Sequence, residues 1–158
     1  MSSSLQAPDD TFSLAGFQQL AEFRYQIRQF LHFSESLARE NGIEPQQHQL
    51  LLAIKGLPEG TRPTVTVLAS RLCLRHHSTV ELINRLADHG AVVRRASDKD
   101  RREVLVELTP YGEEILRKLS LLHWQELQTS GPALSEALQA VVRQTRQVEE
   151  ALHEHRAV

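Results

Sequence analysis

Residues 64–108 combine two short amphipathic helices with a charged β-hairpin, and this order of elements constrains the fold more than any other feature of the chain. Thr66 stands where the N-cap of the first helix belongs, and Cys73-Leu74 is expected to form the turn between the helices. The second helix stops at Gly90, and its apolar residues recur at helical spacing: Val80, Ile83, Leu86 and Ala87. Two short helices joined by a turn predict a helix-turn-helix.

The hairpin is predicted from two strand-like runs, Val92-Val93 and residues 104–108, which flank the decapeptide RRASDKDRRE at positions 94–103. With five cationic side chains, this tip cannot belong to a hydrophobic core. It is either a solvated loop or a finger that reaches an anionic partner. A helix-turn-helix followed directly by such a hairpin is typical of a winged helix, in which one helix enters the major groove of DNA and the hairpin contacts the flanking backbone or minor groove.

The distribution of charge favours contact with an anion. The whole chain has a formal net charge of -2, but residues 60–102 carry nine Lys or Arg against four Asp or Glu. The segments before and after this one are both acidic. A basic segment between acidic flanks indicates that one patch of the surface, rather than the whole molecule, attracts an anion.

Long amphipathic helices are predicted on both sides of this lobe. Apolar residues recur at three- and four-residue steps between residues 17 and 39, and Pro45 suits the first position of the next helix. After the hairpin, Thr109-Pro110 opens another helix, which Ser130-Gly131-Pro132 is expected to break. The last helix carries an apolar stripe from Leu134 to Leu152, which indicates a dimer interface. The alternative is that this stripe packs only on the first helix of the same chain.

Together these elements predict a mainly α-helical protein with a small β-hairpin wing, a winged helix-turn-helix with an N- and C-terminal helical dimerisation region. We expect a disordered tail over residues 1–12 and the dimerisation region over residues 13–44 and 110–158. The winged helix-turn-helix, as the DNA-binding lobe, is expected over residues 45–109.

The sequence TVLASRLCLRHHSTVELINRLADHGAVVRRASDKDRREVLVELTPYGEEIL, residues 66–116, resembles the core of MarR-type transcriptional regulators. The resemblance implies a homodimer built from the first and last helices. Such a dimer would bind a pseudo-palindromic operator on double-stranded DNA, as a repressor that a small-molecule effector or an oxidant releases. The motifs that carry the resemblance are Leu68-Ala69-x-x-Leu72, Ser78-Thr79-Val80, Leu86 to Gly90, Asp98-x-Asp100-Arg101-Arg102 and Leu108-Thr109-x-x-Gly112.

Two stretches depart from the family pattern. Arg75-His76-His77 occupies the place where the family commonly has a Ser-rich helix start, so base preference cannot be transferred to this chain. His48 stands where an aromatic residue is frequent, which changes the lining of the effector pocket that the resemblance implies. The polar candidates for that pocket are Tyr25, Arg28, His32 and His48.

The candidate DNA-binding residues come from the outward face of the second helix and from the wing. Arg and Asn side chains can read base edges by paired hydrogen bonds, whereas Ser and Thr more often hold phosphates. Arg85 suits base reading, phosphate contact or a salt bridge. Asp98 and Asp100 are expected to pair with an arginine and hold the tip in shape. The DNA-binding candidates are Thr66, Arg75, His76, His77, Ser78, Thr79, Asn84, Arg85, Arg95, Lys99, Arg101 and Arg102.

Other classes of function have less support. The chain has no Gly-rich phosphate loop, nucleophile elbow or metal-ligand spacing, so we expect neither an enzyme nor a cofactor or metal site. It shows no secretion signal and no apolar run long enough for a bilayer, which predicts a cytoplasmic protein without a membrane partner. Two alternatives stay open: a dimeric winged-helix module that binds proteins rather than DNA, and a redox-sensing regulator based on the single Cys73.

Overall fold

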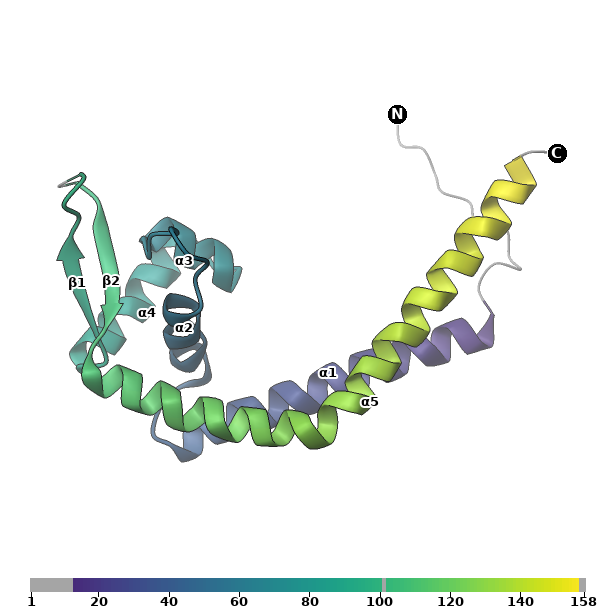
Figure 1. Cartoon of the computed structure of the whole chain (residues 1–158), viewed down its shortest axis with the longest axis horizontal. Coiled ribbons are helices and arrows are strands. Elements are labelled where there is room, and N and C mark those ends of the chain that lie inside the picture. Colours follow the sequence, from purple (N-terminus) through teal and green to yellow (C-terminus); the bar gives the residue numbers. More distant parts are fainter. Residues whose placement is uncertain (1–12, 101, 157–158) are drawn as a thin grey trace. The chain divides into compact units, whose positions relative to one another are not determined.

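The computed structural model describes residues 13–100 and 102–156 (Figure 1). The expected disordered tail over residues 1–12 therefore lies outside the described residues, as does Arg101. The described residues form two compact units, one within residues 33–124 and the other made of residues 13–32 and 125–156. The elements in chain order are α1 Leu14–Glu40, α2 Pro45–Lys55, α3 Val65–Leu72, α4 His76–Asp88, β1 Val92–Ala96, β2 Val104–Leu108 and α5 Pro110–Arg156.

The unit of residues 33–124 is a winged helix, which confirms the predicted fold. Helices α2, α3 and α4 pack together and against the antiparallel hairpin β1–β2. Apolar side chains from all of these elements and from the start of α5 form one buried core, and burying each of them stabilises the fold by about 1.5–3 kcal/mol. Its largest fully buried side chains are Leu50, Leu51, Leu68, Ile83, Leu86, Val92, Val106 and Leu119.

The helix-turn-helix begins two residues earlier than the sequence suggested. Thr64, and not Thr66, is the N-cap of α3, and its hydroxyl accepts a hydrogen bond from the backbone N–H of Val67 at 3.3 Å. The expected cap at Thr66 is therefore wrong. Thr64 and Thr66 both precede the apolar residues of α3 at a distance that suits an N-cap, and only the backbone conformation shows which of the two begins the helix. The turn at Cys73 is confirmed, because Cys73 caps α3 in the left-handed conformation with a φ of 54°.

The first strand of the hairpin is longer than predicted, whereas β2 has the predicted bounds. Val92 pairs with Leu108 and Ala96 with Val104, so β1 continues through Arg94 and Arg95. The tip is therefore residues 97–103, and the expectation that it starts at residue 94 is wrong. Charged residues extend a strand readily when both of its faces meet water, and Arg94 and Arg95 are exposed.

Helix α5 runs without interruption from Pro110 to Arg156, so the predicted break at Ser130-Gly131-Pro132 is wrong. Pro132 has no N–H to donate to the carbonyl of Gln128, which costs a helix interior about 3 kcal/mol. The helix bonds on either side of Pro132 offset this loss. The hydroxyl of Ser130 also donates to the carbonyl of Glu126 at 3.0 Å, which keeps this side chain on the helix.

The start of α5 is fixed to the end of α4. The Thr109 hydroxyl donates to the carbonyl of Gly90 at 2.6 Å and accepts from the N–H of Gly112 at 3.1 Å. The N–H of Thr109 donates to the carbonyl of Ala91 at 3.0 Å. Gly112 approaches the same carbonyl so closely that an added Cβ would overlap it. This close approach explains why the position needs glycine.

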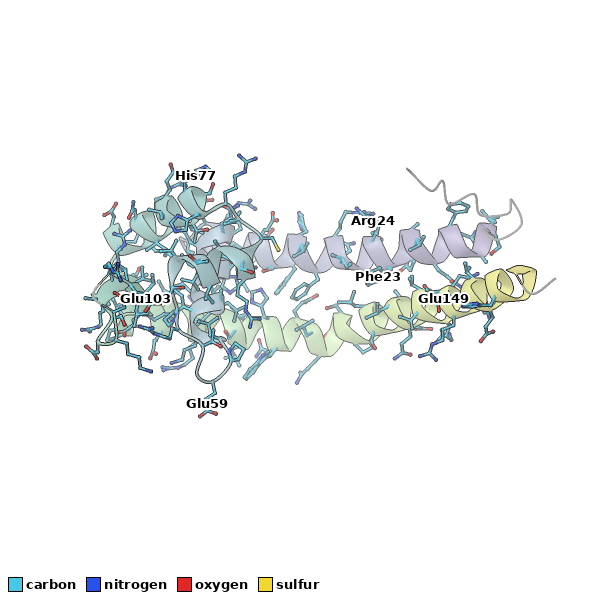
Figure 2. All side chains as sticks on the ribbon, turned by 90° about the horizontal axis from the view of Figure 1, so that it is seen from above. Phe23, Arg24, Glu59, His77, Glu103 and Glu149 are labelled. Atoms are coloured by element: carbon cyan, nitrogen blue, oxygen red, sulfur yellow. The ribbon has the colours of Figure 1, made fainter. Side chains whose placement is uncertain are left out.

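In the second unit, the first part of α1 lies beside the last part of α5. Gly16 lies against the side chain of Gln144, and the two helices enclose a groove of about 240 Å³ with apolar walls from Leu20 and Val141. Phe23 and Arg24 lie on opposite sides of α1, with Phe23 on the side of α5 (Figure 2). Within the part of the chain that the structure describes, no helix has the length and apolarity to cross a membrane.

Candidate nucleic-acid interface

The outward face of α4 carries several of the predicted DNA-binding residues. His76, His77, Asn84 and Arg85 are exposed, and Figure 2 shows His77 projecting from the winged-helix unit. Arg75 occupies the N-cap position of α4, and its side chain makes no capping bond. The structure thus presents a polar helix face next to an uncapped helix start, an arrangement that suits contact with bases and phosphates.

Thr79 does not belong to this face, and its prediction as an outward residue is wrong. Its side chain is fully buried, and its hydroxyl donates to the carbonyl of Arg75 at 3.1 Å. A Thr hydroxyl that bonds to the preceding turn of its own helix tolerates an apolar environment, and the sequence pattern does not reveal this bond. The buried stripe of α4 is Thr79, Leu82, Ile83 and Leu86, so it is rotated relative to the predicted stripe, and Val80 is only half-buried.

Arg85 and the wing cations are held loosely by acidic neighbours. Arg85 lies 3.9 Å from Glu81 one helical turn earlier, and both side chains are about two-thirds exposed. Arg95 pairs with Glu107 across the hairpin at 2.7 Å, also in solvent. Exposed pairs of this kind contribute about 0–1 kcal/mol, so an incoming phosphate can replace the carboxylate at low cost.

At the tip, Asp100 pairs with an arginine as predicted. Its carboxylate accepts the backbone N–H of Arg102 at 2.9 Å and lies 3.5 Å from the Arg102 guanidinium. The Arg102 side chain itself is 93% exposed. Lys99 and Asp98 are exposed as well. The shaping role of Asp98 stays a prediction, as does the predicted contact of Arg101, which lies outside the described residues. Thr66, exposed in the first turn of α3, also stays a candidate.

Sequence reasoning missed three residues that hold the tip. Ser97 is buried, and its hydroxyl accepts the backbone N–H groups of Lys99 at 3.1 Å and Asp100 at 3.3 Å. The guanidinium of Arg62 donates to the same hydroxyl and forms an ion pair with Glu103. Serine is frequent in turns because its hydroxyl can accept backbone N–H groups two and three residues later. The sequence could therefore have indicated the role of Ser97 in this turn. Arg62 is 35 residues away from Ser97 in sequence, and no local pattern connects them.

The four candidates for an effector pocket differ in burial. Tyr25, Arg28 and His32 are exposed on α1, where the Tyr25 hydroxyl accepts a hydrogen bond from Gln29 at 2.5 Å. His48 is buried in the core of the winged-helix unit. A pocket made by these four residues stays a prediction.

His48 belongs to a buried cluster whose other polar members were missed. Its ring stacks on that of His123 with the centroids 4.9 Å apart. His123 donates through Nδ1 to the carbonyl of Leu119 at 2.7 Å, and its Nε2 lies 2.8 Å from the hydroxyl of Ser34. Burial, and then the charge of His123, lower the pKa of His48 to about 4, so the ring is neutral near pH 7. Stacked rings do not direct their nitrogen atoms at a common ion, and the described residues contain no group of three ligands suited to a metal.

The helix α4 and most of the wing lie in a segment that matches a known protein family. Residues 41–103 match the model of a family described as the MarR family. The matched residues include α2, α3, α4 and the first strand of the wing, so the winged-helix lobe is similar to this family. A proposed transcriptional regulatory protein for the hcr operon of Thauera aromatica is 27% identical over 125 residues, which are 79% of this chain and 74% of that protein.

Solved structures of the MarR family share the fold. AbsC, a MarR family transcriptional regulator from Streptomyces coelicolor, superposes with a TM-score of 0.69 at 20% identity and covers 90% of this chain and 97% of its own. BpsR from Bordetella bronchiseptica, whose DNA binding is regulated by 6-hydroxynicotinic acid, superposes with a TM-score of 0.59 at 18% identity. It covers 78% of this chain and 89% of its own. At these identities the likeness to the two structures concerns the fold alone.

Proposed function

We propose that the protein is a DNA-binding transcriptional regulator, a repressor that binds a pseudo-palindromic operator as a homodimer. The observation that carries this proposal is the exposed polar face of α4 beside a basic hairpin, in a lobe similar to the MarR family. In a winged helix, these are the two elements that contact the major groove and the flanking backbone. The half-sites would then lie about one helical turn of DNA apart, because a two-fold dimer presents α4 twice on one face of the duplex.

Exposed apolar side chains on the terminal helices support the homodimer. Leu14 and Leu20 on α1, and Leu138 and Val142 on α5, expose between 44% and 73% of their surfaces in the single chain. Large apolar side chains gathered on one part of a chain usually mark an interface. We infer that a second copy of the chain covers them, as the apolar stripe from Leu134 onward predicts.

Release of the operator by a small-molecule effector is the further part of the proposal. BpsR, which shares the fold, responds to such a molecule. In this chain the candidates for contact with an effector remain Tyr25, Arg28, His32 and His48. Since a ligand shifts an equilibrium only by its differential affinity for two states, an effector of this kind would bind the free dimer more tightly than the DNA-bound dimer.

One experiment separates the regulator from its main rival, a winged-helix module that binds proteins. Bound fragments are selected from a pool of random duplexes, and the affinity for the selected sequence is then measured at several salt concentrations. A regulator should enrich a palindromic motif, and its affinity should fall steeply with salt as lysines and arginines release counterions from phosphates. A protein-binding module should enrich nothing and show no such dependence, and that result would overturn the proposal.

A further inference from the structure

The loop between α2 and α3 runs along β2, the strand of the wing that contacts α2 and α3. Thr64 forms an isolated bridge with Leu105, and the N–H of Val106 donates to the carbonyl of Pro63 at 2.9 Å. Thr64 is also the N-cap of α3, so the same few residues contact the hairpin and begin the helix-turn-helix. Any side chain that connects this loop to the tip of the wing therefore connects the tip to α3.

Arg62 makes that connection at both ends of the tip. One nitrogen of its guanidinium contacts Ser97, the first residue after β1, and Glu103, the last residue before β2. The N–H of Ser97 donates to the carbonyl of Glu103 at 2.9 Å, so the two partners of Arg62 also close the tip between themselves. Figure 2 shows Glu103 at the hairpin end of the winged-helix unit.

The burial of this cluster distinguishes it from the other ion pairs of the wing. The side chains of Arg62 and Glu103 are 35% and 28% exposed, and Ser97 is buried. Arg102, by contrast, is 93% exposed beside Asp100. Hydrogen bonds to a charged group are stronger when water is partly excluded, and losing one partner leaves the others poorly satisfied. Arg62 is thus arranged to hold a structure, whereas Arg102 is arranged to meet a partner.

We propose that Arg62 is a positioning residue that fixes the wing tip relative to α3, and that it does not itself contact DNA. This inference rests on the proposed function, because it assumes that the tip contacts the duplex. Glu103 pairs with Arg62 within the protein, so a phosphate could contact Arg62 only by displacing a carboxylate that is mostly shielded from water. It acts through Lys99 and Arg102, whose backbone positions depend on the turn that Ser97 and Asp100 form.

Two measurements of DNA binding test the proposal: the affinity itself, and the dependence of the affinity on salt concentration. Arg62→Met should weaken binding to the selected operator about tenfold, because a loosened tip must be ordered again on the duplex. The slope of log affinity against log salt should stay unchanged. Arg102→Ala, in comparison, should lower the magnitude of that slope by about 1 per subunit if one phosphate contact is lost. A slope that falls equally in Arg62→Met would identify a phosphate contact and overturn the proposal.

Lys55→Met is the matched control. Lys55 forms a long-range ion pair with Glu113 at 2.6 Å in the same unit, but it lies on α2 and touches no residue of the tip through that pair. Its loss should leave both affinity and slope unchanged. If Lys55→Met weakens binding as much as Arg62→Met does, the effect is general destabilisation and the proposal is overturned.

A double-mutant cycle gives a second test. If Arg62 works through Glu103, then Arg62→Met should cost little in a chain that already carries Glu103→Gln. If Arg62 contacts phosphate, its loss should cost the same in both backgrounds, which would contradict the proposal.

Hydrogen exchange of the free protein keeps this inference separate from the proposed function. The amides of Ser97, Lys99, Asp100 and Glu103 are bonded within the tip and should exchange several-fold faster in Arg62→Met, while those of the α4 core keep their protection. Unchanged exchange at the tip would overturn the positioning role, whether or not the chain binds DNA. Faster exchange in a protein that binds no duplex would leave Arg62 as a brace of the wing and refute only the proposed function.

Discussion

At the scale of single residues, His48 makes stability depend on pH. Its pKa is lowered to about 4 in the folded chain, compared with about 6.5 for an unfolded histidine, so unfolding takes up a proton between these values. The free energy of unfolding should therefore be unaffected by His48 above about pH 6.5 and fall as the pH drops toward 4, by up to about 1.4 kcal/mol per pH unit. Urea unfolding at pH 7.5 and 5.0 measures this, and His48→Leu should show a smaller difference between the two.

The matched control for His48 lies on the same helix. Leu51→Ala opens a cavity in the core and should destabilise by about 2–5 kcal/mol at both pH values, without changing their difference. If His48→Leu keeps the pH dependence of the unmodified chain, another group is responsible and the assignment to His48 is wrong.

Asn84 and Arg85 are the residues of α4 to which we assign sequence reading. Both are exposed on the polar face, and their side chains can pair with adenine and guanine edges. Replacing either with Ala should relax preference at one half-site position by about 1–3 kcal/mol and leave binding to unrelated duplexes nearly intact. Competition titrations against single-base operator variants measure this. A uniform loss across the panel would reassign these residues to the backbone.

At the scale of elements, the two glycines of α5 differ in the space around them. Gly112 packs on the carbonyl of Ala91, whereas nothing lies within 4 Å of the Cβ position of Gly131. Gly112→Ala should therefore lower the free energy of unfolding by about 1–3 kcal/mol through overpacking against backbone. Gly131→Ala should change it by less than about 1 kcal/mol, because the helix propensity of alanine is opposed by the steric restriction that Pro132 places on the residue before it. Thermal unfolding of both variants tests the pair, and equal effects would contradict the close approach at Gly112.

The elements also show how far sequence reasoning reaches. The helix-turn-helix, the hairpin and the amphipathic helices are visible because their periodicity follows from burying one face. The N-cap at Thr64, the buried hydroxyl of Thr79 and the continuity of α5 through Pro132 were not predicted. Each depends on a competition between two local options that differ by about 1–3 kcal/mol, which the apolar pattern does not resolve. A contact between residues far apart in sequence is likewise invisible to a local pattern. The link from Arg62 to the wing is itself such a contact, so the candidate site was predicted as a set of cations without its brace.

At the scale of the whole molecule, the homodimer can be tested without disturbing the fold of the chain. Leu138 and Val142 are exposed in the single chain, so changing both to Asp should leave secondary structure intact while it places charges in the proposed interface. Sedimentation should then show monomer where the unmodified chain is a dimer at micromolar concentration. Gln139→Asp adds a charge to an exposed neighbouring position of α5 and is the control. A stable monomer of the unmodified chain would refute the dimer.

The turn at Cys73 has a practical consequence for such experiments. The chain contains one cysteine, which is exposed and lies between α3 and α4. A nitroxide reagent would therefore attach at a single place in each subunit, and the proposed dimer would carry two spin labels, one beside each α4. Their separation, measured by pulsed dipolar spectroscopy with and without operator DNA, would report directly how far apart the two copies of α4 are held in solution.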